Sequence, residues 1–323
     1  MSSAEPVAPP GRSLVLGAGG FLGSHVAHWL TSRGAPVRLF DLSVRHLPAK
    51  LLEAPGCEVF QGNFLDETDL RRALEGVECV FHLIGATVPF TSLDQVDVEI
   101  RANVLPTVQL LDAMRELGVP LVIFPSSGGT LYGPGSENAQ PSREDTALDP
   151  TCSYGLGKLL IEEVLRFRSA HGGPNHFVLR ISNPYGRSSR SHRVQGVINA
   201  FLTEVLHGRP IQVWGDGRSV RDFVYVEDVI RALSAVLRNA EPNQTFNVGS
   251  GRGHRIPEVI DLVREVTGRD VRVVQRPEAY AGIAYSVLDP SRIERQTGWR
   301  AEVDLRSGIR HTWESMLAQD GMG

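Results

Sequence analysis

The sequence is poor in three features that mark whole classes of protein. It has 3 cysteines, Cys57, Cys79 and Cys152, at unrelated spacings and without a Cys-x-x-Cys pair, which argues against a disulfide framework or a cysteine-based metal site. It has no run of roughly 18 or more apolar residues, so no membrane-spanning helix is expected. Its 33 basic residues do not exceed its 37 acidic residues, so we expect no nucleic-acid partner.

The rest of the composition is that of an ordinary globular protein. Of the 323 residues, 41% are hydrophobic and 22% charged, and the length allows one large domain or two domains that share a cleft. The first residues are rich in Pro, Ala and Ser and contain no signal-peptide core. We therefore expect residues 1–11 to be a disordered tail and the protein to be cytoplasmic, with reduced cysteines and no bound metal.

Short apolar runs alternate with helical patterns from residue 13 to residue 180. Strands are predicted at 13–16, 36–41, 58–61, 77–83, 120–125 and 176–180, and helices at 20–33, 66–75, 93–117 and 152–171. This alternation predicts a doubly wound α/β fold, with a parallel sheet covered by helices on both faces. The pattern becomes irregular after Ile181. We expect residues 12–180 plus 222–249 to form a cofactor-binding domain, and residues 181–221 plus 250–323 a smaller substrate lobe.

The first predicted strand runs into a glycine-rich turn that opens a helix. The turn reads Gly17-x-x-Gly20-x-x-Gly23, with Phe21 and Leu22 before the last glycine. Glycines let the backbone turn tightly and approach a pyrophosphate, whose charge is met by free N–H groups at the helix N-terminus. We therefore predict that these five residues bind a dinucleotide cofactor.

The second predicted strand ends in Asp41. An acid ~20 residues after the glycine turn binds the adenosine ribose in dinucleotide-binding folds. Its charge would repel the extra phosphate of NADP, which favours NAD. Arg38 and Arg45 are near enough in sequence to oppose that preference.

Tyr154 and Lys158 are four residues apart in a predicted helix, so they lie on one helix face. Bringing a tyrosine pKa from ~10 to ~7 means stabilising the phenolate by about 4 kcal/mol, and a close lysine charge supplies part of that. Alone the pair is weak, because any amphipathic helix would show the same apolar stripe: Leu156, Leu159, Leu160 and Val164. With the cofactor motif upstream, it predicts a catalytic tyrosine supported by a lysine.

These motifs together resemble the extended short-chain dehydrogenase/reductases, in particular the NAD-dependent nucleotide-sugar epimerase/dehydratase family. The resemblance covers nearly the whole chain. Further matches, in chain order, are Val80-Phe81-His82-Leu83, Asn103, Ser126-Ser127, Tyr132-Gly133, Arg180-Ile181-Ser182-Asn183-Pro184, Gly215-Asp216-Gly217 and Arg221-Asp222-Phe223. The resemblance implies a Rossmann-type doubly wound parallel sheet with a smaller C-terminal α/β substrate lobe.

The resemblance also assigns cofactor contacts outside the two main motifs. It implies that NAD is bound by Asn63 and Phe64 after the third strand, Leu83 after the fourth, and Asn103 on the next helix. The family usually has an acid where this chain has Asn63, so that contact with the adenine should be weaker. For His82 the sequence leaves open a structural or a site role.

For the substrate, the resemblance implies a nucleotide sugar, with a UDP-sugar expected. Arg221 would pair with the diphosphate, because its planar fork binds phosphate oxygens bidentately. The residues implied elsewhere are Asn183 near the phosphate or glycosyl group, and Ile211, Val213 and Trp214 near the nucleobase. A second family arginine is missing, because its neighbourhood reads Ala279-Tyr280-Ala281 and Arg276 is offset.

One position departs from the family pattern. The family's epimerases have a serine or threonine four residues before the loop tyrosine to bind the reacting sugar hydroxyl, and here that residue is Gly128. Ser127, Thr130 or a water molecule would have to replace it. We favour Thr130, because the glycines before it let the loop turn its side chain inward. The loop also lacks the carboxylate with which related dehydratases move protons, since Gly129 and Thr130 occupy that place.

The sequence thus predicts an NAD-dependent nucleotide-sugar epimerase acting at C4. Tyr154 would take the C4 hydroxyl proton while hydride goes to the nicotinamide, and the 4-keto sugar would take the hydride back on its other face. The same residues would serve a 4-ketoreductase of a deoxysugar pathway, and an inactive binding protein of this fold is a third possibility. The resemblance also implies a homodimer, in which the helices near 93–117 and 152–171 pack against their copies in a second subunit as a four-helix bundle. These helices carry more apolar residues than sheet packing alone obviously requires: Val104, Val108, Leu111, Met114, Leu159, Ile161 and Leu165.

Overall fold

The computed structural model of the protein describes residues 11–85, 87, 95–135, 140–187, 196–215, 217–276 and 283–320. The expected disordered tail lies outside the described residues except for Gly11, and so does the stretch Ala279-Tyr280-Ala281. Within the described ranges, no helix is long and apolar enough to cross a membrane.

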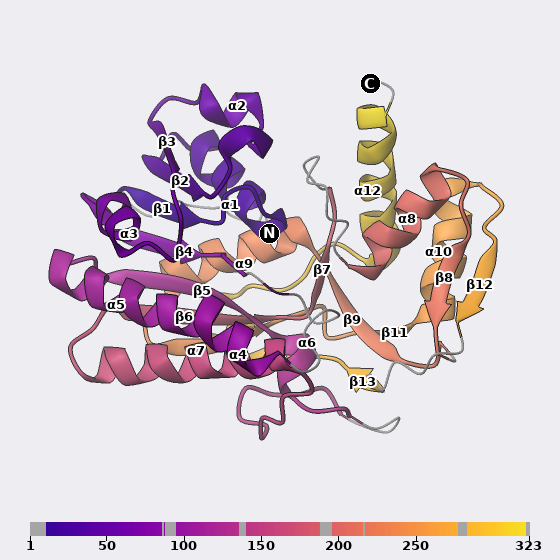
Figure 1. Ribbon diagram of the computed structural model, residues 1–323. Helices are drawn as coiled ribbons and strands as arrows, with labels where there is room; N and C mark the ends of the chain where they lie inside the picture. Colours follow the sequence, from indigo (N-terminus) through magenta and orange to yellow (C-terminus); the bar gives the residue numbers. More distant parts are fainter. Residues whose placement is uncertain are drawn as a thin grey trace.

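A seven-stranded parallel sheet forms the larger body (Figure 1). In spatial order its strands are β10 (Gln244–Val248), β6 (Asn175–Ile181), β5 (Leu121–Ser127), β4 (Cys79–His82), β1 (Ser13–Leu16), β2 (Val37–Asp41) and β3 (Cys57–Gln61). The strand order reverses between β1 and β4. In open α/β sheets the ligand crevice lies outside the carboxyl ends of the strands at such a reversal.

Helices cover both faces of this sheet and bury two separate apolar clusters. Those on one face are α3 (Glu67–Leu74), α5 (Leu105–Leu117) and α7 (Ser153–Ala170). Those on the other are α1 (Phe21–Ser32), α9 (Val226–Asn239) and α11 (Ser291–Thr297). Successive strand residues point to opposite faces, so Leu14 and Leu16 join the first cluster and Val15 joins the second.

Short helical segments complete the larger body. They are η1 (Val44–His46), α2 (Ala49–Leu52), α4 (Val96–Glu99), the π-helical turn η2 (Ile100–Val104) and α6 (Gly128–Leu131). The segments α4, η2 and α5 follow one another without a break, so the π turn lies inside one long helical stretch. α6 follows β5 directly and begins at Gly128.

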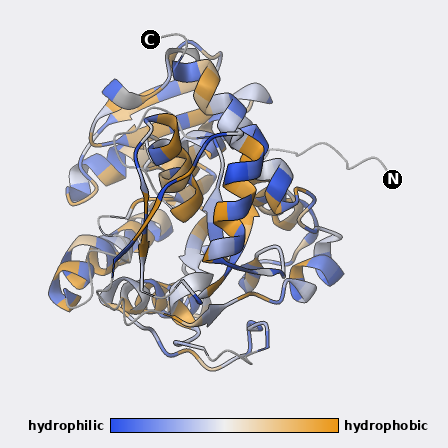
Figure 2. Cartoon of the chain, turned by 90° about the vertical axis from the view of Figure 1, so that its right-hand side faces the viewer, coloured by the Kyte–Doolittle hydropathy of each residue, from blue (hydrophilic) through white to orange (hydrophobic). Residues whose placement is uncertain are grey.

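The smaller lobe has its own sheets and core. In its four-stranded sheet β9 (Val220–Tyr225) pairs with β7 (Asn183–Tyr185), β11 (Gly253–Arg255) and β13 (Tyr285–Ser286), and β8 (Ile211–Trp214) pairs with β12 (Val273–Arg276). Its helices are α8 (Val197–Leu206), α10 (Ile256–Thr267) and α12 (Leu305–Asp320). Figure 2 views the molecule from this side and shows hydrophobic and hydrophilic residues alternating along the helices, as expected of elements with one buried face.

The predicted fold class and the element order from residue 13 to residue 180 are confirmed. Two segments differ from the prediction. The strand at 220–225 does not return to the large sheet, because β6 already pairs with β5 and β10 on its two sides. Conversely α11, predicted in the smaller lobe, packs on the larger body, where Ile293 and Trp299 join the core beneath α9.

The apolar residues that suggested a dimer are mostly buried within one chain. Five of the seven pack in the sheet core: Val104, Leu111, Met114, Ile161 and Leu165. Packing against the sheet therefore accounts for these five residues, and the prediction that the two helices carry more apolar residues than sheet packing requires is wrong. The exposed apolar side chains on α5 and α7 are different ones: Leu105, Leu117 and Phe167.

Candidate active site

The turn from β1 to α1 has the geometry that a pyrophosphate requires. Gly17 adopts a φ of 81°, which favours glycine. A Cβ atom on Gly23 would lie 2.0 Å from the carbonyl oxygen of Gly17, so only glycine lets α1 pack this close to the turn. In the described structure no side chain caps α1, and the first N–H groups of the helix, including those of Phe21 and Leu22, remain for an anion.

Asp41 lies at the carboxyl end of β2 and faces this turn. Its Oδ2 accepts a hydrogen bond from the Gly19 N–H at 2.8 Å. Arg38 faces elsewhere: it is 6% exposed, forms an ion pair with Glu58 at 2.9 Å, and donates to backbone carbonyls at the end of α3. The guanidinium of Arg38 is therefore held by contacts within the fold. Of the two arginines named from the sequence, Arg45 is the exposed one.

The structure places three other expected cofactor residues around the same edge. Asn63 is exposed, and its Oδ1 accepts from the Leu65 N–H at 3.0 Å. Phe64 is 6% exposed and belongs to the core, so it could meet a cofactor only through its backbone. Leu83 is half-buried and lies against Gly17. Their contacts with NAD remain predictions.

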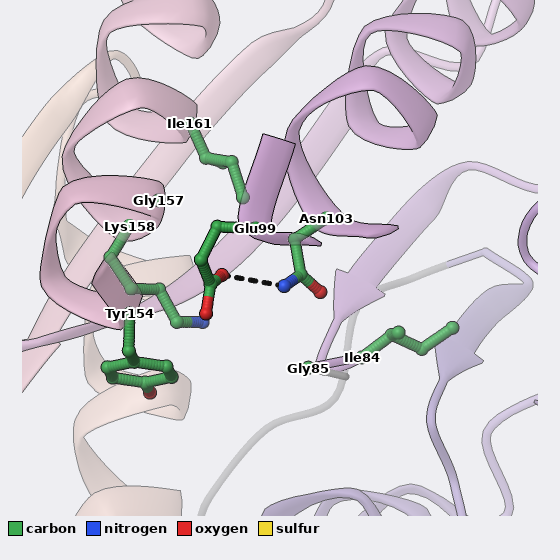
Figure 3. Close-up of a pocket in the computed structure, with 8 residues that line it drawn as sticks. All are labelled: Ile84, Gly85, Glu99, Asn103, Tyr154, Gly157, Lys158 and Ile161. Atoms are coloured by element: carbon green, nitrogen blue, oxygen red, sulfur yellow. Dashed lines mark hydrogen bonds between the residues drawn. The ribbon is translucent and has the colours of Figure 1, made fainter. Parts of the chain in front are cut away.

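Tyr154 and Lys158 lie together on the first turns of α7, over the carboxyl end of β5 (Figure 3). The Lys158 Nζ donates to the Pro125 carbonyl oxygen at 2.9 Å and lies 4.4 Å from the centroid of the Phe124 ring. The same amine lies 5.7 Å from the centroid of the Tyr154 ring. The structure thus brings the predicted pair together.

Burial perturbs both members of the pair. It lowers the pKa of Lys158 to about 8, against the opposing charges of Glu99 and Glu162. It raises the pKa of Tyr154 above its ordinary value, and Glu99 raises that pKa further. Burial and Glu99 thus act against the lowering of the Tyr154 pKa that the sequence predicts from Lys158, and that lowering stays a prediction.

Glu99 is a site residue that the sequence analysis missed. It is 2% exposed, and its Oε2 accepts a hydrogen bond from the Asn103 Nδ2 at 2.8 Å. Both line a pocket with the catalytic pair (Figure 3), whose lining residues are Ile84, Gly85, Glu99, Asn103, Tyr154, Gly157, Lys158 and Ile161. The signal was present, because an acid one helical turn before Asn103 shares its face.

The two candidate hydroxyls in the loop after β5, those of Ser127 and Thr130, differ in their hydrogen bonding. The Thr130 Oγ1 donates to the Ser127 Oγ at 2.9 Å. Thr130 is 6% exposed and packs under α7, where a Cβ on Gly155 would lie 2.8 Å from the Thr130 carbonyl oxygen. Ser127 accepts that bond and keeps its own proton to donate. The geometry favours Ser127 over Thr130.

Leu288 explains why residue 128 is a glycine here. A Cβ on Gly128 would lie 2.5 Å from the Leu288 Cδ1, and Leu288 is 1% exposed. The leucine side chain therefore fills the space that a side chain at residue 128 would occupy. It comes from the segment after β13, far away in sequence.

A buried network of hydrogen bonds and one ion pair lies beneath Tyr154 and Lys158. Arg180 and Glu162 form an ion pair at 2.7 Å with side chains 7% and 6% exposed. Arg180 also donates to the Tyr132 hydroxyl at 2.9 Å, which donates to the Asn247 Oδ1 at 2.7 Å. Ser126 donates to Glu162 at 2.5 Å. The network joins β5, β6, β10 and α7 beneath the catalytic pair.

His82 is a structural residue in this arrangement. It is 2% exposed, and its Nε2 lies 2.8 Å from the Thr107 hydroxyl. Burial lowers its pKa to about 3, so the ring is neutral at physiological pH. Among the described residues, no three His, Cys, Asp or Glu side chains gather as a metal site would need.

Two of the expected substrate residues lie on neighbouring strands of the smaller lobe, and Asn183 approaches the loop after β5. Asn183 donates from its Nδ2 to the Asp222 carbonyl oxygen at 2.8 Å, and its Oδ1 is 4.0 Å from a Cβ built on Gly129. Arg221 is half-buried on β9, and its guanidinium donates to the Val220 carbonyl oxygen at 2.9 Å. Both roles toward a substrate remain predictions.

The three residues expected near the nucleobase differ in exposure. Ile211 and Val213 are 0% and 8% exposed and belong to the core of the smaller lobe. Trp214 is 44% exposed at the end of β8. Of the three, only Trp214 presents its side chain to solvent, so it is the one whose ring could stack on a base.

Comparison with known proteins shows the family of this chain. Residues 13–249 match the family described as the NAD dependent epimerase/dehydratase family. The chain belongs to this family. The family is NAD-dependent, so NAD is the cofactor, and the glycine turn with Asp41 fits it.

Several members of the family are similar over almost their whole length. A UDP-glucose 4-epimerase of Mycolicibacterium smegmatis is 32% identical over 94% of this chain and 97% of its own. A dTDP-4-dehydro-6-deoxyglucose reductase of Escherichia coli is 30% identical over 92% and 94%. The solved structure of a Thermotoga maritima UDP-glucose 4-epimerase with UDP-glucose is 30% identical, with a TM-score of 0.88 over 95% of this chain and 99% of that one. The chain is thus an enzyme-family member similar to both epimerases and a reductase.

Proposed function

We propose that this chain is an NAD-dependent epimerase that acts at C4 of a nucleotide sugar, with a UDP-sugar as substrate. The observation that carries the proposal is the placement of Tyr154 and Lys158 together over the carboxyl end of β5, beside the strand reversal where a cofactor binds. The similarity to two UDP-glucose 4-epimerases supports the reaction and the nucleotide. When bound, NAD accepts a hydride from the sugar and returns it.

The residues of the chain supply the proton chemistry and the positioning. Tyr154 exchanges a proton with the C4 oxygen of the sugar, as general base in one half of the cycle and as general acid in the other. Lys158 places a positive charge beside the phenol. Ser127 donates a hydrogen bond to the same sugar oxygen, on which negative charge develops.

A second candidate, reduction of a 4-keto nucleotide sugar, is favoured by two observations. Leu288 fills the space beside Gly128, where the resemblance places the serine or threonine of an epimerase, and burial raises the pKa of Tyr154, which suits a proton donor. The similarity to the Escherichia coli reductase agrees with this reaction.

One pair of assays tests both candidates. The protein with NAD is incubated with UDP-glucose, and the sugar is identified by chromatography. In parallel, the protein with NADH is incubated with a 4-keto-6-deoxy nucleotide sugar, and NADH absorbance is followed. Formation of UDP-galactose supports the epimerase, and NADH consumption without epimerisation supports the reductase. If neither occurs on any nucleotide sugar that mass spectrometry finds bound to the purified protein, both proposals are wrong and the binding-protein reading remains.

The two loop hydroxyls are expected to differ in effect. Ser127→Ala should lower turnover by ~10²-fold, because removing a donor to a developing oxyanion has roughly that effect. Thr130→Val should have a much smaller effect, since its hydroxyl acts through Ser127. Steady-state kinetics of both variants decides the matter. Full activity of Ser127→Ala would remove the side-chain donor from the mechanism.

Cofactor choice should depend on Asp41. We expect the protein to prefer NAD(H), because the carboxylate at the end of β2 repels the additional phosphate of NADP(H), while Arg38 is held by Glu58. Asp41→Ala should reduce the preference, and Arg45→Ala should leave it unchanged. Titration of apoprotein with both cofactors measures it. Equal binding of the two by the parent protein would show that Asp41 does not select.

We also propose a homodimer formed through α5 and α7. The residues that support it are the exposed apolar side chains of these helices: Leu105, Leu117 and Phe167, which are 51%, 45% and 56% exposed. Light scattering at micromolar concentration should give about twice the 35.3 kDa chain mass, and Phe167→Glu should lower it. A monomeric parent protein would contradict the proposal.

A further inference from the structure

Glu99 is a buried acid set directly against the catalytic turn. A Cβ atom added to Gly157 would lie 2.7 Å from the Glu99 Oε2 and 3.3 Å from the Glu99 Cβ. Gly157 is the residue before Lys158, in the turn that begins at Tyr154. The carboxylate therefore lies over the backbone between the two catalytic side chains, as Figure 3 shows.

The surrounding chain holds this carboxylate in place. The Asn103 Nδ2 and the Thr87 hydroxyl both donate to it. Glu99 ends α4 and is followed by the π-helical turn η2, in which Asn103 lies. Single π turns inside α-helices occur frequently at functional sites, where they re-aim side chains. Glu99 is thus positioned by an irregular turn and two hydrogen bonds.

The other titratable groups near Tyr154 and Lys158 do not provide the negative charge that Glu99 provides. Glu162 lies one turn further along α7, but Arg180 on β6 neutralises it at 2.7 Å. His82 on β4 is neutral, because burial lowers its pKa to about 3. Cys152 precedes α7 and is half-buried. Among the described residues, Glu99 is the carboxylate beside Lys158 that no arginine pairs with.

We propose that Glu99 is a positioning residue of the reaction, a buried counter-charge that keeps Lys158 as an ammonium and Tyr154 as a phenol. The proposal rests on the function assigned above to these two residues. Its consequence is a pH dependence. A tyrosine held as phenol can give a proton to a sugar ketone, and the phenolate that removes a proton from a sugar hydroxyl forms only at higher pH, so Glu99 sets the pH range in which each half of the chemistry runs.

The sign of the effect follows from the charges. A negative charge favours the ammonium form of a neighbouring amine and disfavours a neighbouring phenolate, so it raises the pKa of both groups. Glu99 raises both here, while burial alone lowers the pKa of Lys158. Neutralising Glu99 should therefore shift both titrations to lower pH.

The sequence makes this measurable without any turnover, because the chain contains only two lysines, Lys50 and Lys158. Pulse acetylation of the holoenzyme with acetic anhydride across a pH series, read by mass spectrometry, gives a separate titration curve for each. Lys158 should titrate at a pKa of about 8 in the parent protein. In Glu99→Gln the midpoint should fall by about one pH unit, while Lys50 provides the internal reference.

Matched variants separate charge from packing. Glu163→Gln removes an acid from the exposed side of α7, where Glu163 pairs with Arg166, and should leave the Lys158 curve unchanged. Glu99→Asp keeps the charge and should keep the midpoint near that of the parent. Glu99→Met removes the charge with apolar atoms of similar length, and serves if Glu99→Gln does not fold by circular dichroism. An unchanged Lys158 midpoint in a folded, charge-free variant overturns the proposal.

A kinetic measurement tests the same charge effect during turnover. In Glu99→Gln the pH profile of kcat/KM should move to lower pH by about the same amount as the labelling curve. A folded variant whose pH profile stays where the parent profile lies would overturn the role of Glu99 in the reaction. If the protein has neither proposed activity, the labelling experiment still decides whether Glu99 governs Lys158, so the two failures are distinguishable.

Discussion

Tyr154→Phe is expected to fold, to bind NAD, and to lose at least ~10²-fold in turnover, the usual effect of removing a general acid/base. The variant keeps the ring that packs beside Lys158 and removes only the hydroxyl that exchanges a proton with the sugar. Steady-state kinetics on the substrate found by the paired assays measures the loss. NAD titration and circular dichroism show that site and fold are intact.

Tyr185→Phe is the matched control. Its hydroxyl is also buried, but it lies in the core of the smaller lobe and makes only a 3.5 Å hydrogen bond to the Leu305 carbonyl oxygen. This variant should keep the parental turnover. Near-parental activity of Tyr154→Phe on every nucleotide sugar would remove the tyrosine from the mechanism and with it the proposed function.

Arg180→Met is expected to have the largest effect on stability, lowering the free energy of unfolding by about 3–5 kcal/mol. The substitution removes the cation that pairs with Glu162, and the Glu162 carboxylate, only 6% exposed, is then buried without a counter-charge. The Tyr132 hydroxyl also loses its donor. Urea unfolding followed by circular dichroism measures the change, provided that the transition remains two-state.

Two further variants locate the cause. Arg166→Met breaks the exposed ion pair with Glu163, whose side chains are 71% and 53% exposed, and should cost less than about 1 kcal/mol. Combining Arg180→Met with Glu162→Leu should recover most of the lost stability, because replacing a whole buried pair by apolar groups is often neutral. A single Arg180→Met variant as stable as Arg166→Met would show that burial of the pair does not matter.

The fold was predictable where local pattern decides it. The buried strands of the large sheet are apolar runs separated by amphipathic helices, and those periods are visible in the sequence. Residues 220–225 were not predictable in this way. A short apolar strand fits any sheet, and its place depended on β10 having already taken the free edge of β6.

The site was predictable where a motif carries its own geometry. The glycine turn and the Tyr154/Lys158 pair each depend on spacing within one segment. Glu99 and Leu288 depend instead on which distant segments meet: one packs on Gly157 from another helix, and the other on Gly128 from beyond β13. The effect of burial on the Tyr154 pKa could not be predicted for the same reason, because burial is a property of the assembled protein.

The contact of Leu288 with Gly128 bears on whether this protein is modular. The leucine that completes the loop after β5 arrives from the other end of the chain, and its N–H donates to the buried Asp222 at 3.3 Å. A fragment ending after β10 would keep the whole glycine turn and Tyr154, but the loop after β5 would lose its contact with the Leu288 side chain. Such interleaving raises the sequence separation of contacting residues and slows folding. We therefore expect that exchanging the substrate lobe with that of a relative will fail unless the segment around residue 288 is exchanged to match the loop at 128.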